Sequence, residues 1–257
     1  MQISAIARER RHTLLFLDEI RPFSPVHLDT EVDMSGVLAH REEHRDERRL
    51  SVVTYVLHAA ARVLAAHPEA NAAIRGRLRP RVARYGEVAG KVTLDKRIGG
   101  RRVVVSAVLP DLQRAELPDI QYQLERYRDG DPVSMPEFAP MLLLQRLPGP
   151  IARAAYRRAV RSLARHPRFF GTFAVTSLGH RAVDGFHSVG GTTLTFGIGR
   201  ITDRAVVRDG GVTGAPVMRL NLTFDHRVID GAEAADVLTE VKDLLEGYSA
   251  EKEKETA

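Results

Sequence analysis

Two hydrophobic periodicities alternate along this chain, so its fold must combine strands with helices. Apolar and polar residues alternate over residues 26–34, which is the pattern of a half-buried strand. Over residues 51–66 the apolar residues instead recur at helical spacing, with Ser51 as the predicted N-cap and His67-Pro68 as the stop. A chain with both patterns is predicted to form a mixed α/β domain.

The alternation continues to the C-terminal end of the chain. Further strands are predicted at residues 101–110, 171–179, 192–201 and 217–227, and further helices at 117–127 and 232–246. No long linker and no repeat interrupts these segments, which predicts a single domain over residues 1–247. The charged tail at residues 248–257 is expected to be disordered.

One proline-rich segment, residues 131–170, differs from the rest. Its second half, 151–170, contains six arginines and no acidic residue. Apolar residues recur there at every fourth position, which predicts a basic amphipathic helix with a stripe of Ile151, Ala155, Ala159 and Leu163. Two interpretations stay open. The helix is either a solvated element that packs its stripe on the core, or a surface that binds an anionic substrate carrier through Arg157, Arg158 and Arg161.

Composition excludes several classes of site. The chain has no cysteine, which excludes disulfides, thiolate metal sites and a cysteine nucleophile, and is typical of a reducing cytoplasm. We find no signal peptide and no apolar run long enough to span a bilayer, so we expect a cytoplasmic protein. The formal net charge of +5 favours an anionic partner.

The candidate for chemistry is His226, which ends the apolar face of the predicted strand at residues 217–227. Desolvation at such a position disfavours the imidazolium, which keeps a ring nitrogen free to accept a proton. His226 is therefore a candidate general base. The alternative is a buried histidine that only forms a hydrogen bond with the backbone.

A resemblance to a known family adds to this interpretation. Residues 225–231 read DHRVIDG and precede the last predicted helix, which resembles the DHRxxDG signature of dihydrolipoyl acyltransferases and the HHxxxDG of chloramphenicol acetyltransferases. Residues 27–74 resemble the first strand and helices of that catalytic domain, and GTFAVTSLG at 171–179 resembles its GTFTxSNxG strand. The resemblance covers most of residues 22–128 and 170–247.

The resemblance implies a fold, an activity and an assembly. The implied fold is a chloramphenicol acetyltransferase-like two-layer α/β sandwich, a mixed β-sheet flanked by helices. The implied assembly is a homotrimer or a multiple of three, with active sites between subunits. The implied reaction is direct acyl transfer from a thioester to an acceptor that His226 deprotonates, with no covalent acyl-enzyme and no tightly bound cofactor.

The resemblance also implies the substrates and partners. The acyl donor would be an acyl-CoA, or a thioester on an acyl carrier protein or a lipoyl domain. We therefore expect no nucleic-acid partner, although an anionic membrane surface would compete for the same basic helix.

Two further site residues follow from the resemblance. The family's hydroxyl that stabilises the tetrahedral oxyanion falls at Thr176, with Ser177 beside it on the opposite face of the strand. Asp230 is the predicted cap of the last helix, in a capping box with Glu233. The resemblance implies that Asp230 pairs with Arg10 or Arg11 and supports the site.

Two other motifs are weaker candidates. Residues 180–185 repeat the pattern as HRAVDG, but they are predicted to lie in a loop that at most lines the site. Residues 40–44 match H-x-x-E-H in a charged helix without a third ligand, so we predict no metal site.

Departures from the family leave three hypotheses open. The sequence has no segment like a lipoyl domain or a peripheral-subunit-binding domain, and residues 131–170 appear as an insertion. The first hypothesis is a stand-alone acyltransferase. The others are a detached catalytic core that acts on a lipoyl domain in trans, and a non-catalytic trimeric scaffold.

Overall fold

The computed structural model describes residues 1, 3–46, 48–76 and 78–249. The strands are β1 (Pro25–Asp33), β2 (Ala72–Arg75), β3 (Arg81–Arg84), β4 (Gly90–Ile98), β5 (Arg101–Leu109), β6 (Phe173–Ser177), β7 (Leu194–Arg208) and β8 (Gly211–Asp225). The α-helices are α1 (Arg11–Ile20), α2 (Ser35–Glu43), α3 (Val52–Ala66), α4 (Leu117–Asp129), α5 (Ala139–Arg146), α6 (Gly149–Val160), α7 (His166–Phe170) and α8 (Gly231–Glu246). Short 3-10 helices are η1 (Arg8–Arg10), η2 (Pro136–Phe138), η3 (Leu163–Arg165) and η4 (Gly247–Ser249).

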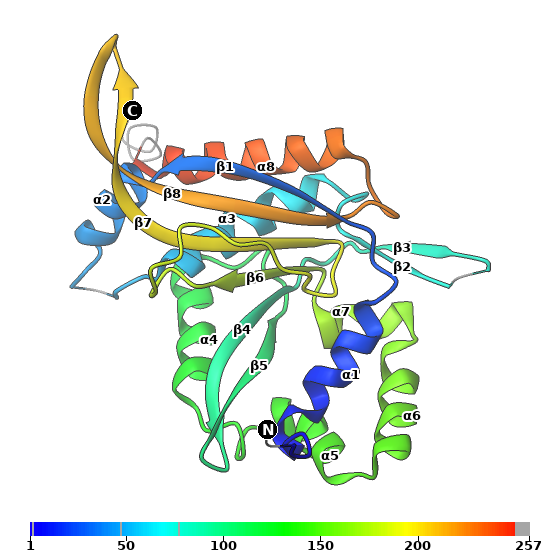
Figure 1. The fold of residues 1–257 in the computed structure, drawn as a ribbon. Helices are drawn as coiled ribbons and strands as arrows, with labels where there is room; N and C mark the ends of the chain where they lie inside the picture. Colours follow the sequence, from blue (N-terminus) through cyan, green and yellow to red (C-terminus); the bar gives the residue numbers. More distant parts are fainter. Residues whose placement is uncertain (2, 47, 77, 250–257) are drawn as a thin grey trace.

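A mixed six-stranded sheet forms the centre of the domain, in the order β1-β8-β7-β6-β4-β5 (Figure 1). β6 pairs in parallel with β4 and β7, and the remaining pairs are antiparallel. β2 and β3 form a separate hairpin. The predicted two-layer α/β sandwich is confirmed, because the helices α3 and α8 run along one face of this sheet (Figure 1).

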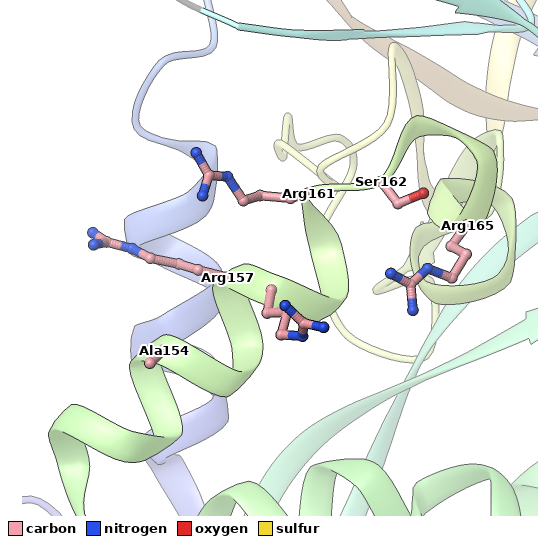
Figure 2. Close-up of a pocket in the computed structure, with 6 residues that line it drawn as sticks. Ala154, Arg157, Arg161, Ser162 and Arg165 are labelled. Carbon is pink, nitrogen blue, oxygen red and sulfur yellow. The ribbon is translucent and has the colours of Figure 1, made fainter.

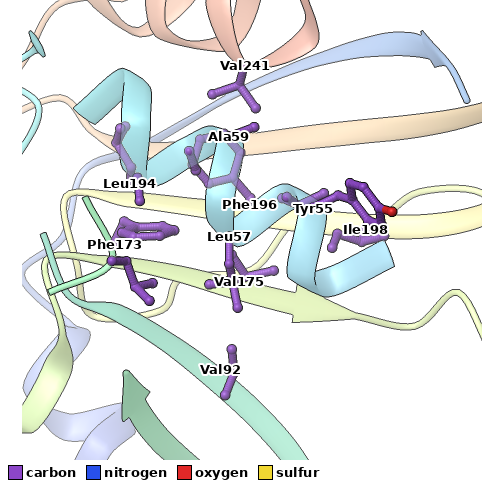
Figure 3. Packing of buried hydrophobic residues seen from close by; sticks show 14 of the residues in the cluster. Tyr55, Leu57, Ala59, Val92, Phe173, Val175, Leu194, Phe196, Ile198 and Val241 are labelled. Carbon is purple, nitrogen blue, oxygen red and sulfur yellow. The ribbon is translucent and has the colours of Figure 1, made fainter. Parts of the chain in front are cut away.

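Helix α3 lies at the centre of the helical layer. The hydroxyl of Ser51 caps it by accepting a hydrogen bond from the Thr54 N–H at 3.2 Å, as the sequence predicts. Tyr55 and Leu57 of α3 are fully buried. Figure 3 shows these side chains between Val241 of α8 and the strands β6 and β7. Truncation of a buried leucine such as Leu57 to alanine lowers the free energy of unfolding by about 2–5 kcal/mol. The packing of α3 between α8 and the sheet is therefore a major source of stability.

The β7–β8 hairpin is longer than the sequence analysis predicted. Both strands continue past the region where β8 pairs with β1, up to a two-residue turn at Asp209-Gly210. Asp209 and Gly210 have φ values of 51° and 78°, the conformation of a type I′ turn. The Asp-Gly pair was the available signal for this extension.

The predicted basic helix over residues 151–170 is wrong as a single element. The chain forms α6, then η3, then α7, because the backbone is extended at Ser162, with ψ of 116°. Pro167 lies in the first turn of α7, where its missing N–H is not needed. The predicted apolar stripe is also wrong, since Ile151 is 55% exposed and the buried residues of α6 are Ala152 and Val160. With α1, α5 and α7, α6 lies beside β4 and β5, away from α8 (Figure 1).

The sequence analysis placed the start of the disordered tail at residue 248, which is too early. Tyr248 is buried, and its hydroxyl lies 2.8 Å from Nδ1 of His58 on α3. This contact fixes η4 against the helical layer. The rest of the predicted tail, residues 250–257, lies outside the described residues. In the described part of the chain, none of the helices is both long and apolar enough to cross a membrane.

Candidate active site

The two faces of the central strands have different chemistry. Phe196 and Phe224 point into the core against the helical layer. Thr176, Gly197 and Asn221 form one row across β6, β7 and β8 on the opposite face. Asn221 is 2% exposed and donates a hydrogen bond to the Gly197 carbonyl at 3.2 Å. This opposite face is therefore polar but tightly packed.

The segment 178–193 lies over this polar face. Its backbone approaches the strands so closely that a Cβ at Gly197 would lie 2.4 Å from the carbonyl oxygen of Phe186, and one at Gly199 would lie 1.9 Å from that of Asp184. The second HRAVDG motif, which begins at His180, lies in this segment without helix or strand, as predicted. Glycines in β7 are thus the reason that a loop can cover the row containing Thr176.

A buried lysine anchors the same segment and was not identified from the sequence. Lys91 of β4 is 3% exposed, and its ammonium nitrogen donates to the Gly190 carbonyl. It lies 5.0 Å and 5.1 Å from the ring centroids of Phe16 and Phe170. Burial lowers the pKa of Lys91 to about 7. The only signal in the sequence was a cation next to the apolar Val92 in a buried strand.

His226 follows β8 directly, in the turn that leads to α8. Its ring centroid lies 5.5 Å from that of Phe224, and its backbone N–H donates to the Ser24 carbonyl at 3.0 Å. The side chain is 45% exposed, so the expected desolvation is wrong for the single chain. The strand ends at Asp225, one residue too early to carry the imidazole into the core.

The flanking residues Asp225 and Arg227 shape this turn. The carboxylate of Asp225 is 1% exposed and accepts hydrogen bonds from Arg227 Nε at 2.9 Å and Nη2 at 2.5 Å. It also accepts from the backbone N–H of Ser24 at 3.3 Å. The Arg227 guanidinium in turn lies 5.2 Å from the ring centroid of Phe23. The buried carboxylate is thus paired with a cation, and this pair lies on either side of His226 in the turn.

Asp230 has a different partner from the predicted ones. It is the N-cap residue of α8, but its side chain makes no capping hydrogen bond, so the predicted capping box is wrong. Oδ1 of Asp230 lies 3.5 Å from Nδ1 of His226, while Glu233 contacts His67 at 2.8 Å. The expected pair with an N-terminal arginine is not found in the described residues. Arg11 instead donates to the backbone carbonyls of α5 and the residue after it.

Thr176 and Ser177 point to opposite faces of β6, as the alternation predicts. Ser177 pairs with Ile198 on the core face, and its hydroxyl accepts from the Gly179 N–H at 3.4 Å. Thr176 lies on the polar face, and its hydroxyl has no hydrogen-bond partner among the described residues. Of the two hydroxyls, that of Thr176 is therefore the one that no described residue binds.

One chain does not bring Thr176 and His226 together. Thr176 is in register with Asn221, and His226 follows Asn221 by five positions along β8 (221 to 226). At about 3.3 Å per residue along a strand, these five positions span roughly 16 Å, and the width of two strand spacings adds to that distance. A site that uses both side chains therefore requires a second copy of the chain.

The remaining predicted site residues lie elsewhere. Arg157, Arg158 and Arg161 line a separate hollow at the end of α6 (Figure 2). His40 and His44 of the H-x-x-E-H motif stack at 4.2 Å, and Nδ1 of His40 lies 2.7 Å from the Tyr55 hydroxyl. Within the described residues, no group of three or more His, Cys, Asp or Glu side chains is placed to hold a metal ion.

Part of the chain is similar in sequence to known acyltransferases. Residues 151–251 match the family of 2-oxoacid dehydrogenases acyltransferase (catalytic domain). This match includes 151–170, so that part of the presumed insertion is not additional to the family. The chain is 57% identical over 49 residues to the dihydrolipoyllysine-residue acetyltransferase component of the pyruvate dehydrogenase complex of Bacillus subtilis. That alignment spans 19% of this chain and only 11% of the relative.

Solved structures share the fold over almost the whole chain. The cubic core of a pyruvate dehydrogenase multienzyme complex has a TM-score of 0.71 at 18% identity, over 97% of this chain and 93% of that one. A dihydrolipoamide acetyltransferase of Azotobacter vinelandii, studied for the catalytic roles of a serine, a histidine and an asparagine, has a TM-score of 0.72 at 17% identity, over the same shares. Residues 151–251 are thus similar to the catalytic domain of 2-oxoacid dehydrogenase acyltransferases, and almost the whole chain shares the fold of these two solved structures.

Proposed function

We propose that this protein transfers an acyl group from a thioester to a thiol, hydroxyl or amine acceptor, with His226 as the general base. The observation that carries the proposal is the geometry of the turn after β8. Asp230 lies 3.5 Å from Nδ1 of His226, which favours the tautomer with its proton on Nδ1. Nε2 of the exposed ring is then free to accept a proton from the acceptor.

The reaction proceeds by direct transfer. Nε2 of His226 removes the acceptor proton as the acceptor's sulfur, oxygen or nitrogen bonds to the thioester carbonyl carbon. The hydroxyl of Thr176 donates a hydrogen bond to the oxyanion of this tetrahedral intermediate. The intermediate collapses with cleavage of the carbon–sulfur bond, and the leaving thiolate takes the proton from the imidazolium. No group of the protein is acylated.

Two copies of the chain supply the two halves of this site. His226 of one subunit would face Thr176 of another, because one chain keeps these residues roughly 16 Å or more apart by register. We infer a homotrimer or a multiple of three, and the solved relative that forms a cubic core supports a multimeric assembly. The neighbouring subunit would also provide the desolvation that His226 lacks in a single chain.

The donor is inferred to be coenzyme A-bound, with a lipoyl domain of another chain as the second candidate. The second candidate is favoured by the Bacillus relative, a component of a pyruvate dehydrogenase complex. No tightly bound cofactor is needed for either substrate. A cytoplasmic enzyme is in keeping with the absence of cysteine.

Mass spectrometry of the purified protein with a panel of acyl-CoAs and of thiol, amine and alcohol acceptors tests this function. Acylated acceptor should accumulate with the intact protein and not with His226→Ala. Addition of a lipoyl domain to the same panel distinguishes the second candidate. The same product yield from both proteins, or no product with any donor, would leave only the scaffold hypothesis.

A further inference from the structure

Arginine side chains surround a hollow at the bend where α6 ends and η3 begins (Figure 2). The hollow has a volume of about 620 Å³. Its lining residues are Ala154, Arg157, Arg158, Arg161, Ser162 and Arg165. Four of these six side chains are cationic and the lining contains no carboxylate, so the hollow favours an anionic ligand.

These four arginines lack the partners that other arginines of the region have. Arg153 of α6 pairs with Asp18 at 2.8 Å, and Arg75 of β2 pairs with Glu19. In the described part of the chain, none of the arginines that line the hollow has an acidic partner or a side-chain hydrogen bond. Like charges this close repel one another, and a bound anion would remove that cost.

The spread of the guanidinium groups indicates what kind of anion fits. Figure 2 shows Arg157 and Arg161 extending to one side of α6, while Arg165 comes from η3 across the hollow. The charges are therefore distributed over the wall instead of converging on one point. Such a distribution suits a ligand with several separated phosphates, each held by the forked N–H groups of arginine.

A lipid surface fits this region less well. A helix that lies on a membrane needs an exposed apolar face beside its basic residues. The apolar residues Ala152 and Val160 of α6 are 2% and 4% exposed, because they pack against the protein. Ile151 is the exposed large apolar residue of α6, and it lies at the opposite end from Arg161, while the other exposed apolar side chains there include the small Ala154 and Ala155.

We propose that this hollow binds the phosphate-bearing nucleotide end of a coenzyme A thioester. The proposal rests on the acyltransferase function proposed above and assigns one part of its substrate to named residues. The position is suitable, because α7 and Gly171 lead directly from Arg165 into β6, which carries Thr176. The ligand's separated phosphate groups match the distributed arginines, and its uncharged pantetheine arm would extend towards the strands.

Calorimetry with adenosine 3′,5′-bisphosphate tests binding without any catalysis. The intact protein should bind this probe, and a variant that combines Arg158→Gln, Arg161→Gln and Arg165→Gln should bind it roughly ten-fold or more weakly. Arg153→Gln is the matched control, since it removes one arginine of the same helix that does not line the hollow. Equal weakening by the control would overturn the proposal, because general charge would then explain the binding. Absence of binding to the intact protein would also overturn it.

Steady-state kinetics separate this proposal from the proposed function. In the triple variant, KM for acyl-CoA should rise by about ten-fold while kcat and the rate with the corresponding acyl-pantetheine stay unchanged. If the triple variant transfers from both acyl-CoA and acyl-pantetheine with an unchanged KM for acyl-CoA, only the assignment of the hollow is overturned. A protein that transfers from neither donor, but binds the bisphosphate through these arginines, would overturn only the proposed function. Binding of phosphatidylglycerol vesicles or an acidic carrier protein, in place of the bisphosphate, would overturn the nucleotide assignment.

Discussion

The carboxylate of Asp225 and the guanidinium of Arg227 form a hydrogen-bonded ion pair that brackets His226. Nε and Nη2 of Arg227 lie 2.9 Å and 2.5 Å from oxygens of that carboxylate. The pair closes the turn after β8, so the residue between the two partners must point outward. We therefore expect Asp225 and Arg227 to position the candidate general base.

This pair predicts an asymmetric effect on stability. Arg227→Gln should lower the free energy of unfolding by more than Asp225→Asn, because it leaves a carboxylate that is 1% exposed without a counter-charge. The guanidinium left by Asp225→Asn is already 29% exposed and can turn into water. We expect a difference of at least ~1 kcal/mol between the two variants in urea unfolding followed by circular dichroism. The double variant should lose less than the sum of the two singles, and strict additivity would mean that the two residues are not coupled.

His226→Ala should lower kcat by roughly two to four orders of magnitude, the usual contribution of a positioned general base. The fold should be retained, because the side chain is 45% exposed and lies after the strand. His180→Ala is the matched control, since His180 begins the same motif in the loop over the polar face. A larger loss of kcat with His180→Ala than with His226→Ala would show that the general base belongs to the motif at His180 and not to the one at His226.

Thr176→Val should lower kcat by one to a few orders of magnitude with little change in KM. The substitution keeps the shape of the side chain and removes the hydroxyl, which is the expected donor to the oxyanion. Ser177→Ala should have a small effect, because Ser177 pairs with Ile198 on the core face. Steady-state kinetics of both variants decide the assignment, and the reverse result would transfer the role to Ser177.

Mixing two inactive variants should restore part of the activity. An oligomer assembled from His226→Ala and Thr176→Val chains contains some interfaces with an intact histidine facing an intact threonine. The two variants can be refolded together and assayed against each variant refolded alone. Light scattering should give a trimer or a multiple of three, whereas an active monomer would contradict the shared site.

Stability should depend on pH through His67. Burial alone would lower the pKa of His67, but hydrogen bonds to Glu233 and Glu240 outweigh burial and raise it. A raised pKa means that this stabilisation is complete below the unfolded value of about 6.5 and is lost as the pH rises through the folded value. The difference in unfolding free energy between the wild type and His67→Gln should therefore be larger at about pH 5.5 than at about pH 8.5.

A matched variant checks the origin of that pH dependence. Combined replacement of Glu233 and Glu240 by glutamine removes both carboxylate partners of His67. In that background, the effect of His67→Gln on the free energy of unfolding should be the same at about pH 5.5 as at about pH 8.5. If the difference persists in that background, another group is responsible for it.

The sequence by itself determined the elements and the candidate base. Periodicity placed β1, α3, α4, β5 and α8 close to their observed bounds, because these elements bury one face and have local start and stop signals such as Ser51. The pleat of β6 also separated Thr176 from Ser177, since alternation is a property of the strand itself.

The tertiary structure decided the features that depend on distant partners. Asp230 makes no cap because its carboxylate turns towards His226, and Glu233 binds His67, the residue that follows α3. Lys91 is buried because the chain brings Phe16 and Phe170 around it. The separation of Thr176 from His226 depends on strand register, which contacts across the whole sheet fix. These contacts join residues far apart in the chain, so no local pattern in the sequence could specify them.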